Sequence, residues 1–177
     1  MKSNTAICVG SSTGGGLLTA DKIMSTSSPR LAFARDLAGN PGINILIGAA
    51  VQCEGAEAEN LLRSQPYFSH PVSWLEQLAS KFIISTDGNG ATCSCVVNAL
   101  RRCSVLLKFS SPNLIYYFRS LEPWRHYISV DTTVDIERAI DEDLSQRSRF
   151  MRITDTQTNL LIILCRSIWY TSMARNS

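Results

Sequence analysis

The sequence predicts an α/β domain in which a Rossmann-like parallel sheet of four or five strands is flanked by helices. Short apolar runs alternate with helix-like segments, and glycine-rich turns follow two of these runs. The stretch 81–108 has the pattern of a strand, a turn, a helix and a second strand, which is typical of a parallel sheet. The chain has 177 residues without a repeat or linker, so we expect one domain over residues 1–177.

The first half of the chain predicts two strands and a helix. An apolar run indicates a strand over Thr5–Val9, followed by a turn rich in glycine and hydroxyl groups. The pattern of Arg30–Leu37 is helical and ends before an Asn-Pro-Gly turn. The run Ile43–Ile47 predicts the second strand, and the polar segment Gln52–Pro71 predicts a turn-rich connection.

The middle of the chain predicts a helix that leads directly into the third strand. Ser73, with Glu76 three residues later, forms a capping box that starts a helix over Trp74–Ser80. The strand Phe82–Ser85 follows, and beyond a glycine turn and another helix the run Val105–Leu107 predicts the fourth strand.

The last third of the chain is expected to complete the sheet and cover it. A short helical segment surrounds Tyr117, and Tyr127–Val130 predicts the fifth strand. Asp131 or Thr133 then caps an acidic helix that ends near residue 144. We expect the tail, residues 146–177, to be helical.

The composition narrows the class of protein. Hydrophobic residues make up 45% of the chain and charged residues 18%, as in an ordinary soluble globular domain. The net charge is +2 and the basic residues are scattered, so nucleic acid is not an expected partner. The apolar stretch 160–170 is too short to span a bilayer and contains Arg166, which favours a terminal helix.

The cysteines predict reduced, mostly packed thiols. They form no CxxC pair and no Cys/His spacing typical of zinc, which indicates a reducing compartment and hence the cytoplasm. The six cysteines are Cys8, Cys53, Cys93, Cys95, Cys103 and Cys165.

Two turns that follow strands are candidate ligand sites. The turn Asp87-Gly88-Asn89-Gly90 precedes a helix, where backbone amides favour an anion and glycines allow close approach. Asn-Gly is also a common turn dipeptide, so a plain tight turn explains these residues equally well. Gly10, Ser11, Ser12 and Thr13 offer amides and hydroxyls to a phosphate or ribose, but a flexible connector would have the same composition.

Other candidate residues have structural alternatives. Lys108 ends a strand, where a lysine can neutralise phosphate or simply reach solvent. We expect most of an aromatic cluster to be core, with one ring free to stack on a ligand, and His126 to be a hydrogen-bonded structural residue. This cluster comprises Tyr116, Tyr117, Phe118, Trp124, His126 and Tyr127.

The acidic residues do not indicate a metal or hydrolase site. We expect a solvated helix face for Asp135, Glu137, Asp141, Glu142 and Asp143. The sequence has no paired carboxylates at an evident cleft, no GxSxG and no HExxH, so it identifies no catalytic residue.

Several segments together resemble the capsule-associated-protein and protein O-glucosyltransferase family, including its lipopolysaccharide-modifying relatives. They are VGSSTGG, SSPRLAFA, SWLEQLASKFIIS, DGNGATCS, SVLLKF and YYF followed by LEPWRHYISV. The segments occur in the family's order and span about residues 6–142.

The resemblance implies a glycosyltransferase that uses a nucleotide-sugar, commonly a UDP-sugar, and a glycan, lipopolysaccharide or protein hydroxyl as acceptor. The family has two Rossmann-like halves in a GT-B arrangement, and this chain resembles only the C-terminal, donor-binding half. The resemblance implies no metal and no cofactor besides the donor substrate, and allows a peripheral association with the inner membrane. The implied donor-binding residues are Gly10, Ser11, Ser12, Thr13, Asp87, Gly88, Asn89, Gly90, Ala91, Ser94 and Lys108.

The chain departs from the family in two ways. The acceptor half, which supplies the proposed catalytic base, has no counterpart here. The family also carries an arginine for the donor diphosphate where Cys95 lies, and Arg101 and Arg102 are too far along the helix to replace it. Weaker donor binding is therefore expected, and an inactive or truncated remnant that serves as a binding or regulatory domain is the alternative function.

Overall fold

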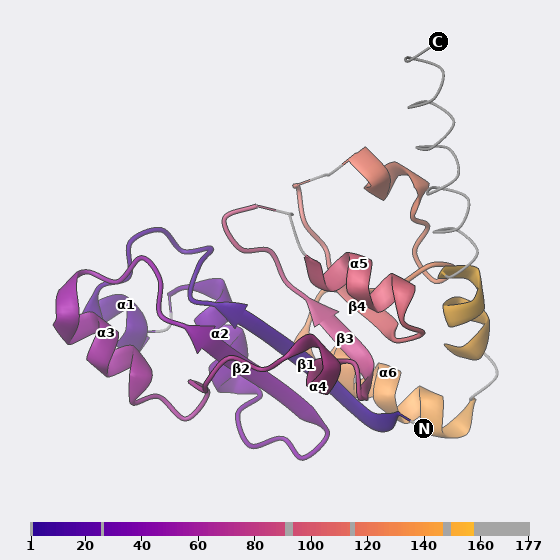
Figure 1. The fold of residues 1–177 in the computed structure, drawn as a ribbon, viewed down its shortest axis with the longest axis horizontal. Coiled ribbons are helices and arrows are strands. Elements are labelled where there is room, and N and C mark those ends of the chain that lie inside the picture. The colour runs from indigo at the N-terminus through magenta and orange to yellow at the C-terminus, as the bar shows by residue number, and fades with distance from the viewer. Residues whose placement is uncertain (1, 26, 91–93, 114–115, 147–149, 158–177) are drawn as a thin grey trace, which may run out of the picture.

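The computed structural model describes residues 2–25, 27–90, 94–113, 116–146 and 150–157. Its centre is a five-stranded sheet in the order β2-β1-β3-β4-β5, with every neighbouring pair parallel (Figure 1). This confirms the predicted fold class. The strands are β1 (Ser3–Ser11), β2 (Ile43–Ala49), β3 (Ser80–Ser85), β4 (Val105–Phe109) and β5 (Ile128–Val130).

Helices connect the strands and cover both faces of the sheet (Figure 1). They are α1 (Ala20–Ser25), α2 (Pro29–Asp36), α3 (Gly55–Arg63), α4 (Trp74–Gln77), α5 (Ser94–Arg101), α6 (Thr133–Ser145) and the 3₁₀ helix η1 (Tyr116–Ser120). In the predicted helical tail, residues 150–157 are helical and residues 158–177 lie outside the described part of the chain. No helix within the described ranges is long and apolar enough to cross a membrane.

The alternation of side chains along the strands divides the core into two clusters. Ala6 and Cys8 of β1 belong to the larger cluster, together with side chains from α2, α3 and α6. Ile7 points to the other face and packs in a smaller cluster with Val96 and Leu100 of α5. Because successive side chains of a strand point to opposite faces, β1 contributes to both clusters.

The structure corrects several local expectations. The connection over 52–71 contains α3, an amphipathic helix that buries Ala58 and Leu62. The capping box of Ser73 and Glu76 is confirmed, but α4 ends at Gln77 and Ser80 already belongs to β3.

The acidic helix α6 also differs from the expectation. It begins after Thr132, not after Asp131 or Thr133, and the Asp135 carboxylate accepts hydrogen bonds from the Asp131 and Thr132 amides. Asp143 is buried rather than solvated, because it forms an ion pair with Lys81.

The strand order creates a crevice at one edge of the sheet. The chain leaves β1 toward β2 on one side, whereas β3 pairs with β1 on the other side. The loops that follow β1 and β3 therefore diverge, and ligands of open α/β sheets bind at such switch points.

Candidate functional site

A cavity of about 490 Å³ lies at this switch point and is the main candidate site. The described residues that line it are Cys8, Val9, Gly10, Ser11, Thr13, Arg30, Trp74, Ile84, Thr86, Gly88, Asn89, Gly90 and Cys95. The structure thus brings six of the predicted donor-binding residues to one hollow, namely Gly10, Ser11, Thr13, Gly88, Asn89 and Gly90. The glycines among them border the cavity with main-chain atoms alone, which offers backbone amides to a ligand.

The two turns pack directly against each other. The Gly14 amide donates a hydrogen bond to Asn89 Oδ1 (3.1 Å), and the hydroxyls of Ser11 and Thr13 lie 3.1 Å apart. Gly14 has a φ of +100°, and a β-carbon there would lie 3.1 Å from the Gly88 carbonyl oxygen. The close approach of the turns therefore requires glycine at this position.

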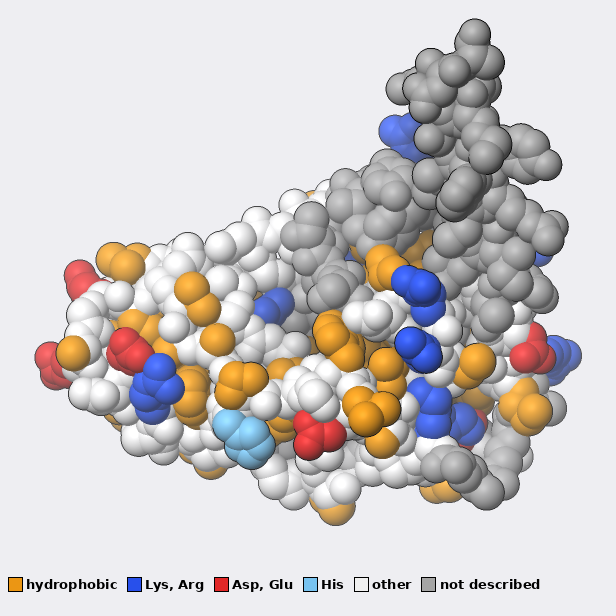
Figure 2. All heavy atoms as spheres, viewed as in Figure 1, with side chains coloured by type: hydrophobic (Ala, Val, Ile, Leu, Met, Phe, Trp, Pro, Cys, Tyr) orange, Lys and Arg blue, Asp and Glu red, His pale blue; other side chains and the backbone are white. Residues whose placement is uncertain are grey.

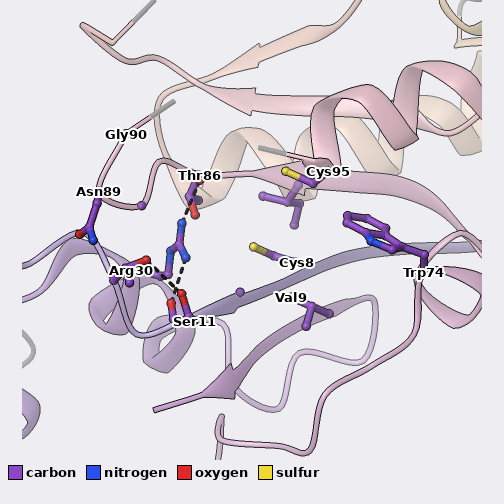
Figure 3. A pocket seen from close by; sticks show the side chains of 13 residues that line it. Cys8, Val9, Ser11, Arg30, Trp74, Thr86, Asn89, Gly90 and Cys95 are labelled. Atoms are coloured by element: carbon purple, nitrogen blue, oxygen red, sulfur yellow. Dashed lines mark hydrogen bonds between the residues drawn. The ribbon is translucent and has the colours of Figure 1, made fainter. Parts of the chain in front are cut away.

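Arg30, near the start of α2, joins the ends of β1 and β3. Its Nη1 donates a hydrogen bond to the Ser11 carbonyl (2.9 Å), and its Nη2 donates one to the Thr86 carbonyl (3.0 Å). Figure 3 shows the guanidinium between these two residues, at the edge of the cavity. Arg30 Nε is buried and has no hydrogen-bond partner among the residues that the structure describes.

The glycines at the strand ends make room for this guanidinium. A β-carbon at Gly10 would lie 2.7 Å from Arg30 Nη1, and one at Gly88 would lie 3.3 Å from Arg30 Nη2 and 2.8 Å from Thr13 Oγ1. These distances are shorter than ordinary van der Waals contact. Gly10 and Gly88 are thus needed for the position of Arg30.

Arg30 supplies positive charge where the sequence suggested a missing arginine. Its hydrogen-bond partners are neutral carbonyl oxygens, and within the described ranges no carboxylate forms an ion pair with it. Cys95 lines the same cavity, and its Sγ lies 3.5 Å from Ser85 Oγ. Arg101 and Arg102 are exposed at the end of α5, where Figure 2 shows basic side chains gathered.

Sequence reasoning missed the role of Arg30, although the segment SSPRLAFA contains it. The available signal was a proline at the first helical turn followed directly by an arginine, which places that side chain at the start of α2. A helix that follows a strand of a parallel sheet begins at the carboxyl edge, so an arginine in its first turn can reach the strand ends.

Of three other predicted donor-binding residues, one does not line the main cavity, and two lie wholly or partly outside the described part of the chain. Ser12 is fully buried, and its hydroxyl donates to the Val51 carbonyl (2.7 Å) and accepts from the Val51 amide (2.8 Å). Its role in the structure is to hold the loop after β2. Ser94 begins α5, but its side chain, like the whole of Ala91, lies outside the described part.

Asp87 and Lys108 interact with each other beside a second cavity. Lys108 lines this cavity of about 320 Å³, its Nζ lies 3.7 Å from Asp87 Oδ1, and it lies over the ring of Phe118 (4.8 Å to the centroid). The other Asp87 oxygen accepts hydrogen bonds from the Ser111 hydroxyl and from Asn113 Nδ2 (2.9 Å). The pair thus ties the turn after β3 to the loop after β4.

The environment of Asp87 favours its ionised form. Burial alone would raise its pKa, but the hydrogen bonds from Ser111 and Asn113 and the charge of Lys108 outweigh burial. The pKa of Asp87 is therefore lowered below its ordinary value of 3.8. At neutral pH the carboxylate is charged and neutralises Lys108.

Most of the described part of the aromatic cluster is packed, as expected. Phe118 and Tyr127 pack against the smaller hydrophobic cluster, and Trp124 is 49% exposed. The side chains of Tyr116 and Tyr117 lie outside the described part of the chain. His126 is buried, and its Nδ1 accepts a hydrogen bond from the Glu122 amide (2.9 Å). Burial, followed by the charge of Arg125, lowers the pKa of His126. This confirms the predicted structural histidine.

The main cavity combines a guanidinium with glycine turns, and carboxylate and imidazole groups are missing from its described lining. Its described lining contains no Asp, Glu or His. Nor does any cluster of three or more potential metal ligands occur in the ranges that the structure describes. The arrangement can hold an anion and stabilise developing negative charge.

Comparison with known proteins supports the fold. No protein-family model and no curated protein matches the chain. One similar solved structure is that of Anabaena Alr3699/HepE in complex with UDP, with a TM-score of 0.53 and 11% identity over 97% of this chain. The chain spans about half of that protein, 49% of its length.

A second similar structure is the C-terminal domain of LpcC, a glycosyl transferase group 1 family protein from Francisella tularensis. It has a TM-score of 0.50 and 12% identity, and the match covers 90% of this chain and 84% of that domain. At this level of identity the likeness concerns the fold. The chain therefore has the Rossmann-like fold of one half of a GT-B glycosyltransferase.

Proposed function

We propose that this chain binds the diphosphate of a nucleotide-sugar, most simply a UDP-sugar, and forms the donor-binding part of a glycosyltransferase. The observation that carries the proposal is the guanidinium of Arg30, held between the ends of β1 and β3 in the main cavity with no carboxylate partner in the described part of the chain. A diphosphate is the ligand class that matches a fixed positive charge beside glycine turns.

Three further observations support this proposal. The cavity volume of about 490 Å³ lies within the range of roughly 300–1,000 Å³ that is usual for small-molecule sites. The structure of HepE, which shares the fold, is a complex with UDP. The segments that resemble the O-glucosyltransferase family also include both turns of the cavity.

In this function the chain stabilises the leaving group. An acceptor hydroxyl of a glycan, lipopolysaccharide or protein attacks the anomeric carbon, and the bond from that carbon to the diphosphate oxygen breaks. The diphosphate leaves with the bonding electrons, and Arg30 together with backbone amides of the turns stabilises its growing charge. The proton of the hydroxyl passes to a base that lies outside the described cavity lining.

The second candidate function is a binding or regulatory domain without transfer activity. It is favoured by the absence of Asp, Glu and His from the described lining of the main cavity. The two functions share the ligand and differ in turnover. A domain of the second kind binds UDP-glucose without releasing glucose or UDP.

Titration calorimetry of the whole chain with UDP and UDP-glucose tests the proposal. We expect dissociation constants near the micromolar range, and no heat with either compound at millimolar concentration would refute it. Arg30→Gln should weaken binding about 10- to 100-fold, because a charge-assisted hydrogen bond contributes about 1.5–3 kcal/mol.

A control variant lies on the same helix. Arg35 of α2 is exposed and forms a surface ion pair with Asp36. Arg35→Gln removes the same charge from the chain without touching the cavity, so its affinity for UDP should equal that of the wild type. Equal loss in both variants would mean that overall charge, rather than the Arg30 site, controls binding.

A further inference from the structure

The main cavity has two chemically different ends. At one end lie Arg30 and the polar turns with Ser11, Thr13 and Asn89. Toward the other end the labelled lining consists of Val9, the thiols of Cys8 and Cys95, and the indole of Trp74 (Figure 3). Figure 3 shows Trp74 on the far side of Cys8 and Val9 from Arg30, with its ring directed toward the cavity.

The position of Trp74 is fixed by the short helix that begins with it. The Ser73 amide donates to Glu76 Oε2 (2.9 Å), and the Glu76 amide donates to Ser73 Oγ (3.3 Å). Gln77 is buried, and its Nε2 donates to the Val72 carbonyl (2.8 Å). A ring on such a platform is already positioned before a ligand arrives, which lowers the entropic cost of binding.

The partly buried Trp74 contrasts with its neighbour in the same helical turn. Leu75 is 84% exposed and does not line the cavity. The turn therefore directs its aromatic residue into the cavity and its aliphatic residue into solvent. The indole adds apolar surface that remains accessible from the hollow.

The chemistry of this end suits a heteroaromatic ring better than a sugar. A sugar ring requires hydrogen-bond partners for several hydroxyls, and the described residues at this end include no carboxylate, amide or basic side chain. A nucleobase needs few such partners when its face stacks on an aromatic side chain.

We propose that Trp74 stacks on the base of the nucleoside diphosphate whose phosphates lie at Arg30. This inference rests on the proposed function. The ligand then extends along β1, with its charged part at the strand ends and its base over the apolar end of the cavity. The sugar of a nucleotide-sugar makes no contact with Trp74 in this arrangement.

Calorimetry with pyrophosphate, UDP and UDP-glucose tests the arrangement in three variants of the whole chain. Trp74→Ala should weaken UDP and UDP-glucose by the same factor, about tenfold or more, and leave pyrophosphate unchanged. Trp74→Phe keeps a ring and should retain most of the affinity for UDP. Leu75→Ala, the control, should bind all three ligands as the wild type does.

Fluorescence gives a second measurement that does not depend on the alanine variant folding. A chain with Trp124→Phe and Trp169→Phe retains Trp74 as its sole tryptophan. UDP should quench its emission, and saturating pyrophosphate should not.

Each other outcome overturns a defined part of the proposal. Unchanged UDP affinity in Trp74→Ala, or unchanged emission with UDP bound, refutes the stacking. A loss specific to UDP-glucose places the sugar, not the base, at Trp74. A loss that includes pyrophosphate indicates a structural role. If the wild type binds neither pyrophosphate nor UDP, the proposed function itself fails.

Discussion

Arg30 and Lys108 both lie at the carboxyl edge of the sheet, each beside a cavity, but they differ in whether a carboxylate lies beside the positive charge. Arg30 donates to the carbonyl oxygens of Ser11 and Thr86, so its charge is not neutralised by a described carboxylate. Lys108 lies 3.7 Å from the ionised Asp87 and over Phe118. A basic residue at a strand end is thus less available to an anion where the fold places a carboxylate beside it.

The interactions of Asp87 and Lys108 indicate a structural role. Asp87, with Lys108, Ser111 and Asn113, connects the turn after β3 to the loop after β4. Neither Asp87 nor Lys108 lines the main cavity. This network therefore holds two loops at the carboxyl edge of the sheet together without facing that cavity.

The largest effect on stability is expected when Lys108 loses the carboxylate of Asp87. Asp87→Asn leaves the buried Lys108 without its counter-charge and weakens the bonds from Ser111 and Asn113. The free energy of unfolding should fall by about 2–3 kcal/mol, measured by urea denaturation at neutral pH. Asp36→Asn, which removes an exposed partner of Arg35, should change it by less than about 0.5 kcal/mol. Equal stability of Asp87→Asn and the wild type would contradict the structural role.

The same site should make stability depend on acid pH. Because the folded pKa of Asp87 is lowered below 3.8, its contribution is complete above that value and is lost as the pH falls through the folded pKa. The stability difference between the wild type and Asp87→Asn should therefore shrink on acidification below about pH 4. Denaturation curves of both proteins at several pH values measure it. A difference that stays constant would rule out the Asp87 titration as its cause.

A change at Gly10 should disturb the charged site without disturbing the fold. In Gly10→Ala the new methyl group would lie 2.7 Å from Arg30 Nη1, and the flexible guanidinium can move aside. We expect affinity for UDP to fall about tenfold, with a loss of unfolding free energy below about 1 kcal/mol. Gly90→Ala adds the same group to open space in the same cavity and should bind UDP within about threefold of the wild type.

A second cation in the main cavity should increase the affinity of that cavity for UDP. Cys95 borders the same hollow as Arg30, so Cys95→Arg adds a second guanidinium to that hollow. Affinity for UDP should increase about tenfold in calorimetry. Cys103→Arg, at an exposed position, adds the same charge outside the cavity and should not increase it. No gain in Cys95→Arg would show that the diphosphate does not reach this residue.

The smallest effect is expected from the neutralised cation itself. Lys108→Gln removes a charge that Asp87 already compensates, so affinity for UDP should change by less than about threefold. The titration should be made at a temperature where thermal unfolding shows the variant to be folded. A loss as large as that of Arg30→Gln would place Lys108 in the ligand site after all.

Local patterns in the sequence predicted the sheet and the two turns well. Short apolar runs placed all five strands, and a capping box placed the start of α4. The helix α3 was missed because its polar face dominates the composition of 52–71, while only Ala58 and Leu62 are buried. The helix α1 was also missed, because it has only six residues, follows a glycine-rich segment and buries a single residue, Ile23.

The pairing of charges could not be predicted, because it depends on contacts between distant segments. Arg30 reaches residues 19 and 56 positions away, and Asp87 meets Asn113 26 positions away. The sequence places Lys108 at a strand end, but it does not show that a carboxylate lies beside it. Such contacts follow from the strand order, which periodicity alone does not reveal.

The bridge made by Arg30 has a consequence for how this domain evolves. One side chain both fastens the ends of β1 and β3 and provides the cavity with its charge. Selection for a stable sheet therefore retains the charge whether or not the chain acts on a substrate. An inactive descendant would keep the positive charge at its cavity as a by-product of folding.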